Sequence, residues 1–470
     1  MVQLKIKILT MASLLVACTK DRGIPDNASS YPENIASIML GKCSVSGCHN
    51  SQSKQAAAGL SLSSWSELFE GSRNGSVVIP FRPDFSTLCY YTNSIPTLGP
   101  SLNPNMPLND KPIPVEEYNE IKTWITNGAP DSKGNIKYAN SSGKFYITNQ
   151  LCDLVTAVDE TTKLPARYIN VGILNKVEFP VCIKVSPDKK NWYVSFLASP
   201  ILQKFNCDKD APESYVDLGN GVWSSFVISS DSKYAYCANA SKNGEIIKVD
   251  LKTMQLSGSI HDPLLVYPRC ISLDNYHKKL YVGSENQHYI CILNLEGNKK
   301  SKQIPLGNST AIAITTDSES GRCFVGCAES NEIKCIETVH DSIIASVYLG
   351  TTPGNIEHIK STNKLLVTCF DDSVSFPGYI GSLKIINLAT MQVEKTIYPG
   401  CQPAGIKSNS SKSFALIVNS NISPKGPKPH HITGCGGRNG FISFLNLETL
   451  EIMPSKKYEL AVYPSAIDLR

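Results

Sequence analysis

The sequence predicts a multidomain chain in which a small all-α domain precedes an all-β seven-bladed propeller. Residues 33–131 contain two helix-like segments joined by long loops, whereas the rest of the chain repeats a four-strand pattern. This pattern recurs about every 40–50 residues, a period typical of propeller blades. At 470 residues the chain is also too long for one small core, so more than one domain is expected.

The composition excludes several classes of protein. Charged residues make up 18% of the chain and apolar residues 41%, which excludes a largely disordered protein. The 45 basic residues nearly balance the 41 acidic ones, and no basic block stands out. We therefore expect no nucleic-acid partner.

The first residues are typical of an export signal. A positively charged start leads into the apolar run Ile8–Ala17, which is too short to span a bilayer. Leu15-Val16-Ala17-Cys18 resembles a bacterial lipobox, and this resemblance implies cleavage before Cys18 and acylation of that residue. We therefore expect a signal peptide over residues 1–17, a tether over residues 18–32 and a lipid anchor in the cell envelope, at the outer membrane facing the periplasm or the surface. An ordinary secretory signal with a chance cysteine is the alternative.

Cys43 and Cys48, followed by His49, form the first motif that carries chemistry. The usual signature for covalent haem attachment has two residues between its cysteines, and here there are four. Each thiol must reach one haem vinyl group and the histidine must lie under the iron, and a longer loop that contains Gly47 still allows this. A disulfide and a zinc pair are the alternatives for these two cysteines.

Two later segments favour the haem interpretation. Met106 precedes Pro107 in a polar loop rich in turn residues, which is not a usual place for a core methionine. Residues 115–127 predict a helix that begins after a proline and ends before a glycine. Its apolar residues share one face: Tyr118, Ile121, Trp124 and Ile125.

The order of these elements resembles that of a class I-type c cytochrome. Residues 121–130 resemble the closing helix of bacterial cytochrome modules of the planctomycete and Bacteroidetes kind, and the resemblance extends over residues 33–131. It implies a cytochrome c-like domain in which Tyr118 and Trp124 pack on the haem side of the closing helix. The four-residue spacer between the cysteines departs from the common pattern.

The resemblance also implies the roles of the site residues. Cys43 and Cys48 would hold one covalent haem c through thioethers, with His49 as the proximal and Met106 as the distal ligand of the iron. Because the protein would then fill both axial positions, electron transfer is more natural than catalysis. A redox partner protein is therefore expected.

The repeats define the second domain over residues 138–470. Seven copies of a Tyr-Val/Ile-Thr/Ser strand begin at positions 144, 191, 233, 279, 322, 364 and 413, and strands that end in Asp or Asn follow them. This pattern resembles the YVTN family of propellers. The chain ends on one extra first-strand copy, so we expect the C-terminal strand 462–470 to complete the first blade, which removes the free edges of the ring.

Two long insertions, Phe370–Gly381 and Ser420–Gly440, are predicted on the same propeller face in neighbouring blades. A metal site, a second-haem site or a docking loop is one interpretation. A solvated loop is the alternative, and we favour it because the ligand spacing is not tight. The candidate ligands in these loops are Asp371, Asp372, His430, His431 and Cys435.

Most other cysteines are expected to be buried free thiols, because they lie in strand patterns where small apolar residues fit. Cys182 and Cys270 occupy one repeat position in blades two apart, so no disulfide between them is expected. Cys89 is also expected to be a buried free thiol. The strand cysteines are Cys237, Cys291, Cys323, Cys327, Cys335 and Cys369.

The sequence thus predicts a haem c-binding electron-transfer lipoprotein whose propeller docks a partner or a ligand. One alternative is a periplasmic oxidoreductase with a second cofactor on the propeller face. In layout this would resemble the nitrite reductases that join a cytochrome c domain to a propeller. The other alternative is a propeller binding protein without redox turnover.

Overall fold

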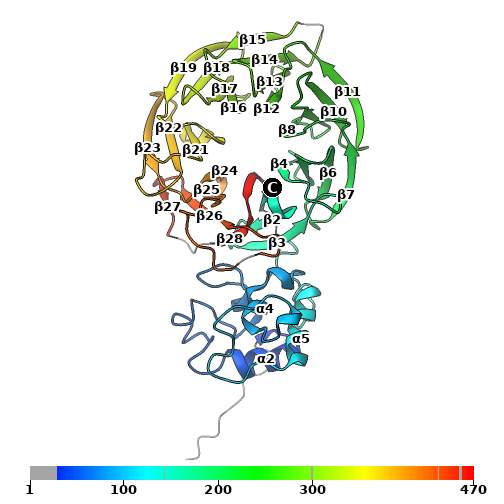
Figure 1. Ribbon diagram of the computed structural model, residues 1–470, viewed down its shortest axis with the longest axis vertical. Coiled ribbons are helices and arrows are strands. Elements are labelled where there is room, and N and C mark those ends of the chain that lie inside the picture. The colour runs from blue at the N-terminus through cyan, green and yellow to red at the C-terminus, as the bar shows by residue number, and fades with distance from the viewer. Residues whose placement is uncertain (1–28, 142, 298–299, 432, 455–457) are drawn as a thin grey trace, which may run out of the picture.

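The computed structural model describes residues 29–141, 143–297, 300–431, 433–454 and 458–470. The chain forms a ring of seven sheets, with the N-terminal region, residues 29–140, packed against one edge of the ring (Figure 1). The seven-bladed propeller predicted from the repeats is therefore confirmed.

Each blade is an antiparallel sheet whose strands follow one another from the innermost strand outward. The first blade has β29 (Pro464–Leu469), β1 (Lys144–Asn149), β2 (Leu154–Asp159) and β3 (Pro165–Asn170), and the second has β4 (Pro180–Val185), β5 (Asn191–Phe196), β6 (Ile201–Asn206) and β7 (Pro212–Asp217). The third has β8 (Ser225–Ile228), β9 (Tyr234–Ala238), β10 (Glu245–Asp250) and β11 (Gln255–His261), and the fourth has β12 (Pro268–Asp274), β13 (Lys279–Ser284), β14 (Tyr289–Asn294) and β15 (Lys302–Pro305).

The remaining three blades follow the same order. The fifth has β16 (Ala311–Asp317), β17 (Arg322–Cys327), β18 (Glu332–Glu337) and β19 (Ser342–Tyr348), and the sixth has β20 (Ile356–Ile359), β21 (Lys364–Cys369), β22 (Ser382–Asn387) and β23 (Gln392–Ile397). The seventh has β24 (Pro403–Asn409), β25 (Phe414–Asn419), β26 (Asn439–Asn446) and β27 (Glu451–Ile452), and β28 (Tyr458–Val462) also pairs with β26. Single 3-10 turns precede three strands: η4 (Gln150–Cys152), η5 (Lys360–Thr362) and η6 (Ser410–Lys412).

The propeller core lies between adjacent sheets. The second strands carry apolar residues on both faces because both faces are covered, whereas outer strands such as β7 and β11 are mostly exposed. Trp192 shows the packing between blades, since its ring stacks on Phe205 of its own blade at 3.9 Å and on Tyr146 of the first blade at 5.1 Å.

The C-terminal strand completes the first blade and closes the ring, as the number of repeats predicts. β29 pairs with β1 so that Ile467 lies opposite Ile147. The carboxylate of Asp468 then accepts a hydrogen bond of 2.8 Å from the main-chain N–H of Val185 in the second blade. One strand from the end of the chain thus covers the inner edge of β1 and joins the first two blades.

The N-terminal region contains few regular elements. Its described α-helices are α2 (Glu33–Ile38), α3 (Trp65–Leu68), α4 (Thr87–Thr92) and α5 (Val115–Thr126), with a π-helical turn η1 (Met39–Cys43) and 3-10 turns η2 (Pro83–Phe85) and η3 (Pro96–Leu98). The helices predicted at the two ends of the region are present. The Gly-, Pro- and Ser-rich stretch between them forms mainly loops, because those residues favour turns over helix.

The predicted small all-α cytochrome c-like domain is wrong. The described α-helices are only 4 to 12 residues long, and the fold as a whole is almost all-β. The apolar core of the N-terminal region lies mainly within that region and continues onto the first blade. Ile121 of α5 shares a buried cluster with Ala166 of β3, and Ile79 packs with Leu154 and Tyr168 of the first blade.

Polar contacts fix the N-terminal region on the outer strand of the first blade. The Ser76 hydroxyl donates to the Pro165 carbonyl at 2.6 Å, and the Arg82 guanidinium donates to the Tyr168 carbonyl at 2.9 Å. The ring of Phe85 stacks on Tyr168 at 4.3 Å. The two parts of the chain therefore meet along a packed interface.

The predicted signal peptide, residues 1–17, and the predicted lipid-bearing Cys18 lie outside the described residues. The last residues of the predicted tether, 18–32, belong to the packed region, because Tyr31 is buried and its hydroxyl donates to the Ser64 carbonyl at 3.0 Å. No helix in the described part of the chain is long and apolar enough to cross a membrane.

Candidate functional site

A cavity of about 420 Å³ lies between the N-terminal region and the propeller. Its volume is in the range of small-molecule and cofactor sites. Apolar side chains such as Leu60, Leu88 and Leu102 form much of its wall. The chemistry-bearing residues that line it are Cys43, Cys48, His49, Met106, His430, His431 and Glu459.

The cysteine motif enters the cavity as one compact turn. The π-helical turn η1 ends at Cys43, and the main-chain N–H of His49 donates to the Cys43 carbonyl at 3.0 Å. Gly47 has a φ of +80°, a left-handed conformation that glycine adopts without strain. Both thiols and the imidazole therefore line the same cavity in spite of the four-residue spacer.

The two cysteines of the motif are free thiols, Cys43 buried and Cys48 exposed. The structure therefore does not join them in a disulfide. The described residues also contain no group of three or more His, Cys, Asp or Glu side chains that could hold a metal ion, which speaks against a zinc pair.

His49 has the properties of a metal ligand. Burial lowers the pKa of its imidazole, so the ring is neutral near pH 7, and the neutral form is the one that binds metals. Its Nδ1 atom is buried without a hydrogen-bond partner. The turn that carries it is fixed from behind, since the N–H of Leu62 donates to the His49 carbonyl at 2.7 Å.

Met106 reaches the same cavity because its loop is fixed to α4. The main-chain N–H of Met106 donates to the Tyr91 carbonyl at 2.7 Å, and the N–H of Leu102 donates to the Tyr90 carbonyl at 2.9 Å. The structure thus brings together all four residues that the sequence predicts for cofactor binding.

Tyr118 and Trp124 do not have the position that the cytochrome resemblance implies. Both side chains are buried, but neither lines the cavity. Trp124 packs edge-on against Tyr31 at 6.2 Å, and its indole N–H donates to the Pro130 carbonyl at 2.8 Å. The apolar face of α5 therefore forms core rather than cavity wall.

His430 and His431 line the cavity together with Glu459 of β28. Nδ1 of His430 lies 2.9 Å from Oε1 of Glu459, and Nδ1 of His431 lies 3.3 Å from Oε2. The main-chain N–H of His430 also donates to Oε1 at 2.6 Å. We call these three residues the His–Glu cluster. The sequence singled out the two histidines but not Glu459, which lies in a strand without any motif.

The loop 420–440 is fixed rather than loose. The Arg438 guanidinium donates to the Gly426 carbonyl at 2.9 Å and to the Asn421 carbonyl at 3.1 Å. A disulfide joins Cys435 to Cys152, in the turn between β1 and β2. This pair was not predicted from the sequence. Its only sequence signal is that both cysteines lie outside the strand patterns, and Cys207 and Cys401 share that property.

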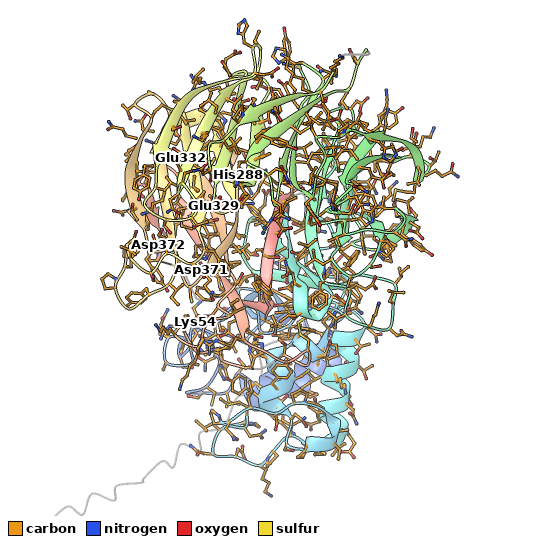
Figure 2. The ribbon with its side chains drawn as sticks, turned by 45° about the horizontal axis from the view of Figure 1, so that its top comes forward. Lys54, His288, Glu329, Glu332, Asp371 and Asp372 are labelled. Carbon is orange, nitrogen blue, oxygen red and sulfur yellow. A yellow bond between two sulfur atoms is a disulfide. The ribbon has the colours of Figure 1, made fainter. Side chains whose placement is uncertain are left out.

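Asp371 and Asp372 do not line the cavity, and Figure 2 shows where they lie on the propeller. Asp371 is exposed, whereas the buried carboxylate of Asp372 accepts hydrogen bonds from the main-chain N–H groups of Val374 and Ser375, both at 3.0 Å. Burial by itself would raise the pKa of Asp372, but hydrogen bonds from Ser375 and Ser382 lower it to about 2. Asp372 therefore orders its own loop. The predicted joint site of these aspartates with the two histidines is not formed.

Comparison with known proteins adds information on the fold. No protein family's sequence profile matches the chain, and no curated protein matches it with significance. A solved structure of a functionally unknown protein from Desulfotomaculum acetoxidans DSM 771 is similar, with a TM-score of 0.53 and 12% sequence identity. The similarity covers 70% of this chain and 99% of that one. At this identity it supports the propeller fold and nothing about activity.

Proposed function

We propose that the chain binds one haem c covalently and acts as an electron carrier. Cys43 and Cys48 would attach the haem through their thiols, and His49 and Met106 would bind its iron. The observation that carries this proposal is that all four residues line one largely apolar cavity, although Met106 follows the motif only after a long loop. When bound, the haem supplies one-electron redox chemistry.

The donor set supports a haem rather than another group. A neutral imidazole and a thioether sulfur are the ligands of low-spin electron-transfer haems, and the soft sulfur of Met106 favours reduced iron. Two free thiols that line the same cavity as the imidazole would provide the covalent attachment. The apolar wall would limit the access of water and so raise the reduction potential further.

An electron carrier is favoured over a catalyst because His49 and Met106 together would occupy both axial positions of the iron. The chain then offers no open position for a substrate at the metal. Its role would be to receive an electron from one protein and pass it to another.

We further propose that the propeller docks the partner and that Cys18 anchors the chain in the cell envelope. The lipobox resemblance supports the anchor. Support for docking comes from large apolar side chains that are exposed on loops of one propeller face over the first three blades. Such patches are typical of protein-binding surfaces. They are Ile173, Leu174, Val177, Leu197 and Val222.

The proposal is tested by producing the chain in a host with haem-attachment machinery. We expect a c-type visible spectrum and a haem stain that persists on a denaturing gel, and both should be lost in Cys43→Ala/Cys48→Ala. Cys89→Ala is the matched control, because Cys89 is a buried free thiol of the same region that does not line the cavity. A wild-type chain without haem, or a double variant with full haem stain, would contradict the proposal.

A further inference from the structure

The His–Glu cluster is the part of the cavity wall that the proposed electron carrier does not use. It belongs to the propeller, since His430 and His431 come from the loop between β25 and β26, and Glu459 comes from β28. The side chain of Glu459 is only 3% exposed, and both its oxygens have an imidazole partner. A carboxylate this deeply buried needs such partners, because water no longer solvates its charge.

The charge of the cluster depends on the number of protons that it holds. With both imidazoles neutral and Glu459 ionised, the cluster has one negative charge, and one added proton neutralises it. Burial lowers the pKa of His431, and the nearby Glu459 carboxylate acts in the opposite direction. The proton affinity of such a group depends strongly on any other charge in the same cavity.

Two tyrosines also face the cluster, and both stay uncharged around pH 7. Tyr90 of α4 packs on His431 at 5.6 Å, and burial raises its pKa to about 12. Tyr168 of β3, whose hydroxyl donates to the Glu459 carbonyl, also has a pKa raised by burial. Both phenols are therefore neutral around pH 7.

The remaining described charged and polar groups around the cluster are three cations, one amide and a lysine across the cavity. Arg82 and Arg438 donate to main-chain carbonyls, and Lys428 lies in the same loop as the two histidines. The Asn439 amide donates to the His431 carbonyl at 3.0 Å and also to Oε2 of Glu459 at 3.5 Å, so it contacts the cluster itself. Across the cavity, the ammonium group of Lys42 is paired with Glu117 at 2.5 Å.

We infer that the His–Glu cluster is a proton-binding site coupled to the redox state of the cofactor in the same cavity. This inference rests on the proposed function. An electron that arrives from the redox partner adds one negative charge to the cavity, and the cluster then binds one proton from water. Reoxidation releases that proton. The exchange can proceed through His430, whose side chain is 42% exposed, whereas His431 is 14% exposed.

The inference assigns a task to the propeller that the N-terminal region cannot perform alone. The propeller would set how the reduction potential depends on pH. A tenfold difference in proton affinity between the two redox states corresponds to about 59 mV between the acidic and alkaline limits of the potential. The potential should fall as the pH rises, because protonation of the cluster favours the reduced state.

The test measures the potential of the haem-loaded protein between pH 5 and pH 9 by spectroelectrochemical titration. We expect the pH dependence in the wild type and its loss in both Glu459→Gln and His431→Asn. His340→Asn is the control, because Nδ1 of His340 lies 2.9 Å from a Glu337 oxygen in an exposed His–Glu pair that does not line the cavity. This control should keep the wild-type profile.

Three outcomes would overturn the inference. The wild-type potential could be independent of pH, both cluster variants could keep the wild-type profile, or the His340→Asn control could lose it. Should the variants not fold, proton uptake by the wild type on reduction, followed with a pH indicator in weak buffer, decides the question, since zero uptake contradicts the inference. A chain that binds no haem refutes the proposed function instead, so the two failures are distinguishable.

Discussion

The propeller and the N-terminal region are stabilised in different ways. Each blade repeats the same sheet and packs on two neighbours, and β29 closes the ring. The N-terminal region has short helices and long loops, packs its own small core, contacts the first blade through a few side chains and borders a cavity. The comparison teaches that repeated blades stabilise the propeller, whereas we propose that the N-terminal region also relies on the group that its cavity would bind.

The largest expected effect is the loss of ring closure. Deletion of residues 463–470 removes β29, exposes the inner edge of β1 and leaves the contact of Asp468 with the second blade unmade. We expect the whole propeller to lose cooperative thermal unfolding, measured by circular dichroism. The control is Tyr215→Ser on the exposed outer strand β7, which should unfold like the wild type. Cooperative unfolding of the shortened chain would contradict the account of closure.

The next effect should be confined to the N-terminal region. Without covalent haem, Cys43→Ala/Cys48→Ala leaves the cavity of about 420 Å³ without the group around which we propose the region packs. We expect rapid proteolysis within residues 44–114, with the propeller fragment intact on a gel. Equal protease resistance of the haem-loaded wild type and this variant would show that the region does not need the cofactor.

Removal of the disulfide should have an intermediate effect at the junction of the two parts. Cys152→Ser/Cys435→Ser frees the loop 420–440 from the first blade, and we expect a loss of about 2–4 kcal/mol in the free energy of unfolding. Denaturant titration measures it. Reductant should destabilise the wild type by a similar amount and leave the variant unchanged, and a variant that still responds to reductant would contradict this assignment.

A smaller effect tests the propeller core through pH. Burial lowers the pKa of His358, which lies on β20 near Asp317 and Phe324. Since the unfolded chain titrates near pH 6.5, the unfolded state binds more protons below that pH, and stability is lost as the pH falls from 6.5 toward the lower folded pKa. Each unit of that shift corresponds to about 1.4 kcal/mol.

Denaturant titrations at pH 7 and pH 5 measure this effect. His358→Leu should lose less stability between the two values than the wild type. His340→Leu is the control, because His340 is 81% exposed. Equal losses in the wild type and His358→Leu would show that His358 does not carry the pH dependence.

The smallest expected effect concerns Met106 and is measured as a change in reduction potential. Met106→Ala should keep the thioethers, His49 and the fold but remove the soft sulfur that favours reduced iron. We expect the reduction potential to fall by about 59 mV for each tenfold loss of that preference. Any weak far-red sulfur-to-iron band of the oxidised protein should vanish. An unchanged potential and band would exclude Met106 as a ligand.

The propeller could be predicted because each of its blades repeats the same sequence pattern. A strand such as β13, Lys279–Ser284, is a weak signal by itself, but seven spaced copies leave few other folds. The all-α prediction for residues 33–131 failed because it relied on the order of motifs. The loops between the two predicted helices contain too many helix-breaking residues to form more helix.

The part of the site whose residues lie close together in sequence could be predicted, because the chemistry restricts their spacing. The part that ring closure brings together could not. Cys43, Cys48 and His49 are close in sequence, so their shared cavity follows from local geometry. Glu459 and the Cys152–Cys435 pair reach the same junction only because the end of the chain returns to the first blade. No local pattern in the sequence records that contact.

The central claim is that the cavity between the two parts binds a covalent haem. The most direct test is the intact mass of the purified chain under denaturing conditions, followed by sequencing of the peptide that contains residues 43–49. The account predicts the mass of one added haem, with both Cys43 and Cys48 modified. An unmodified mass, with both thiols open to alkylation in a host that loads other c-type proteins, would contradict it.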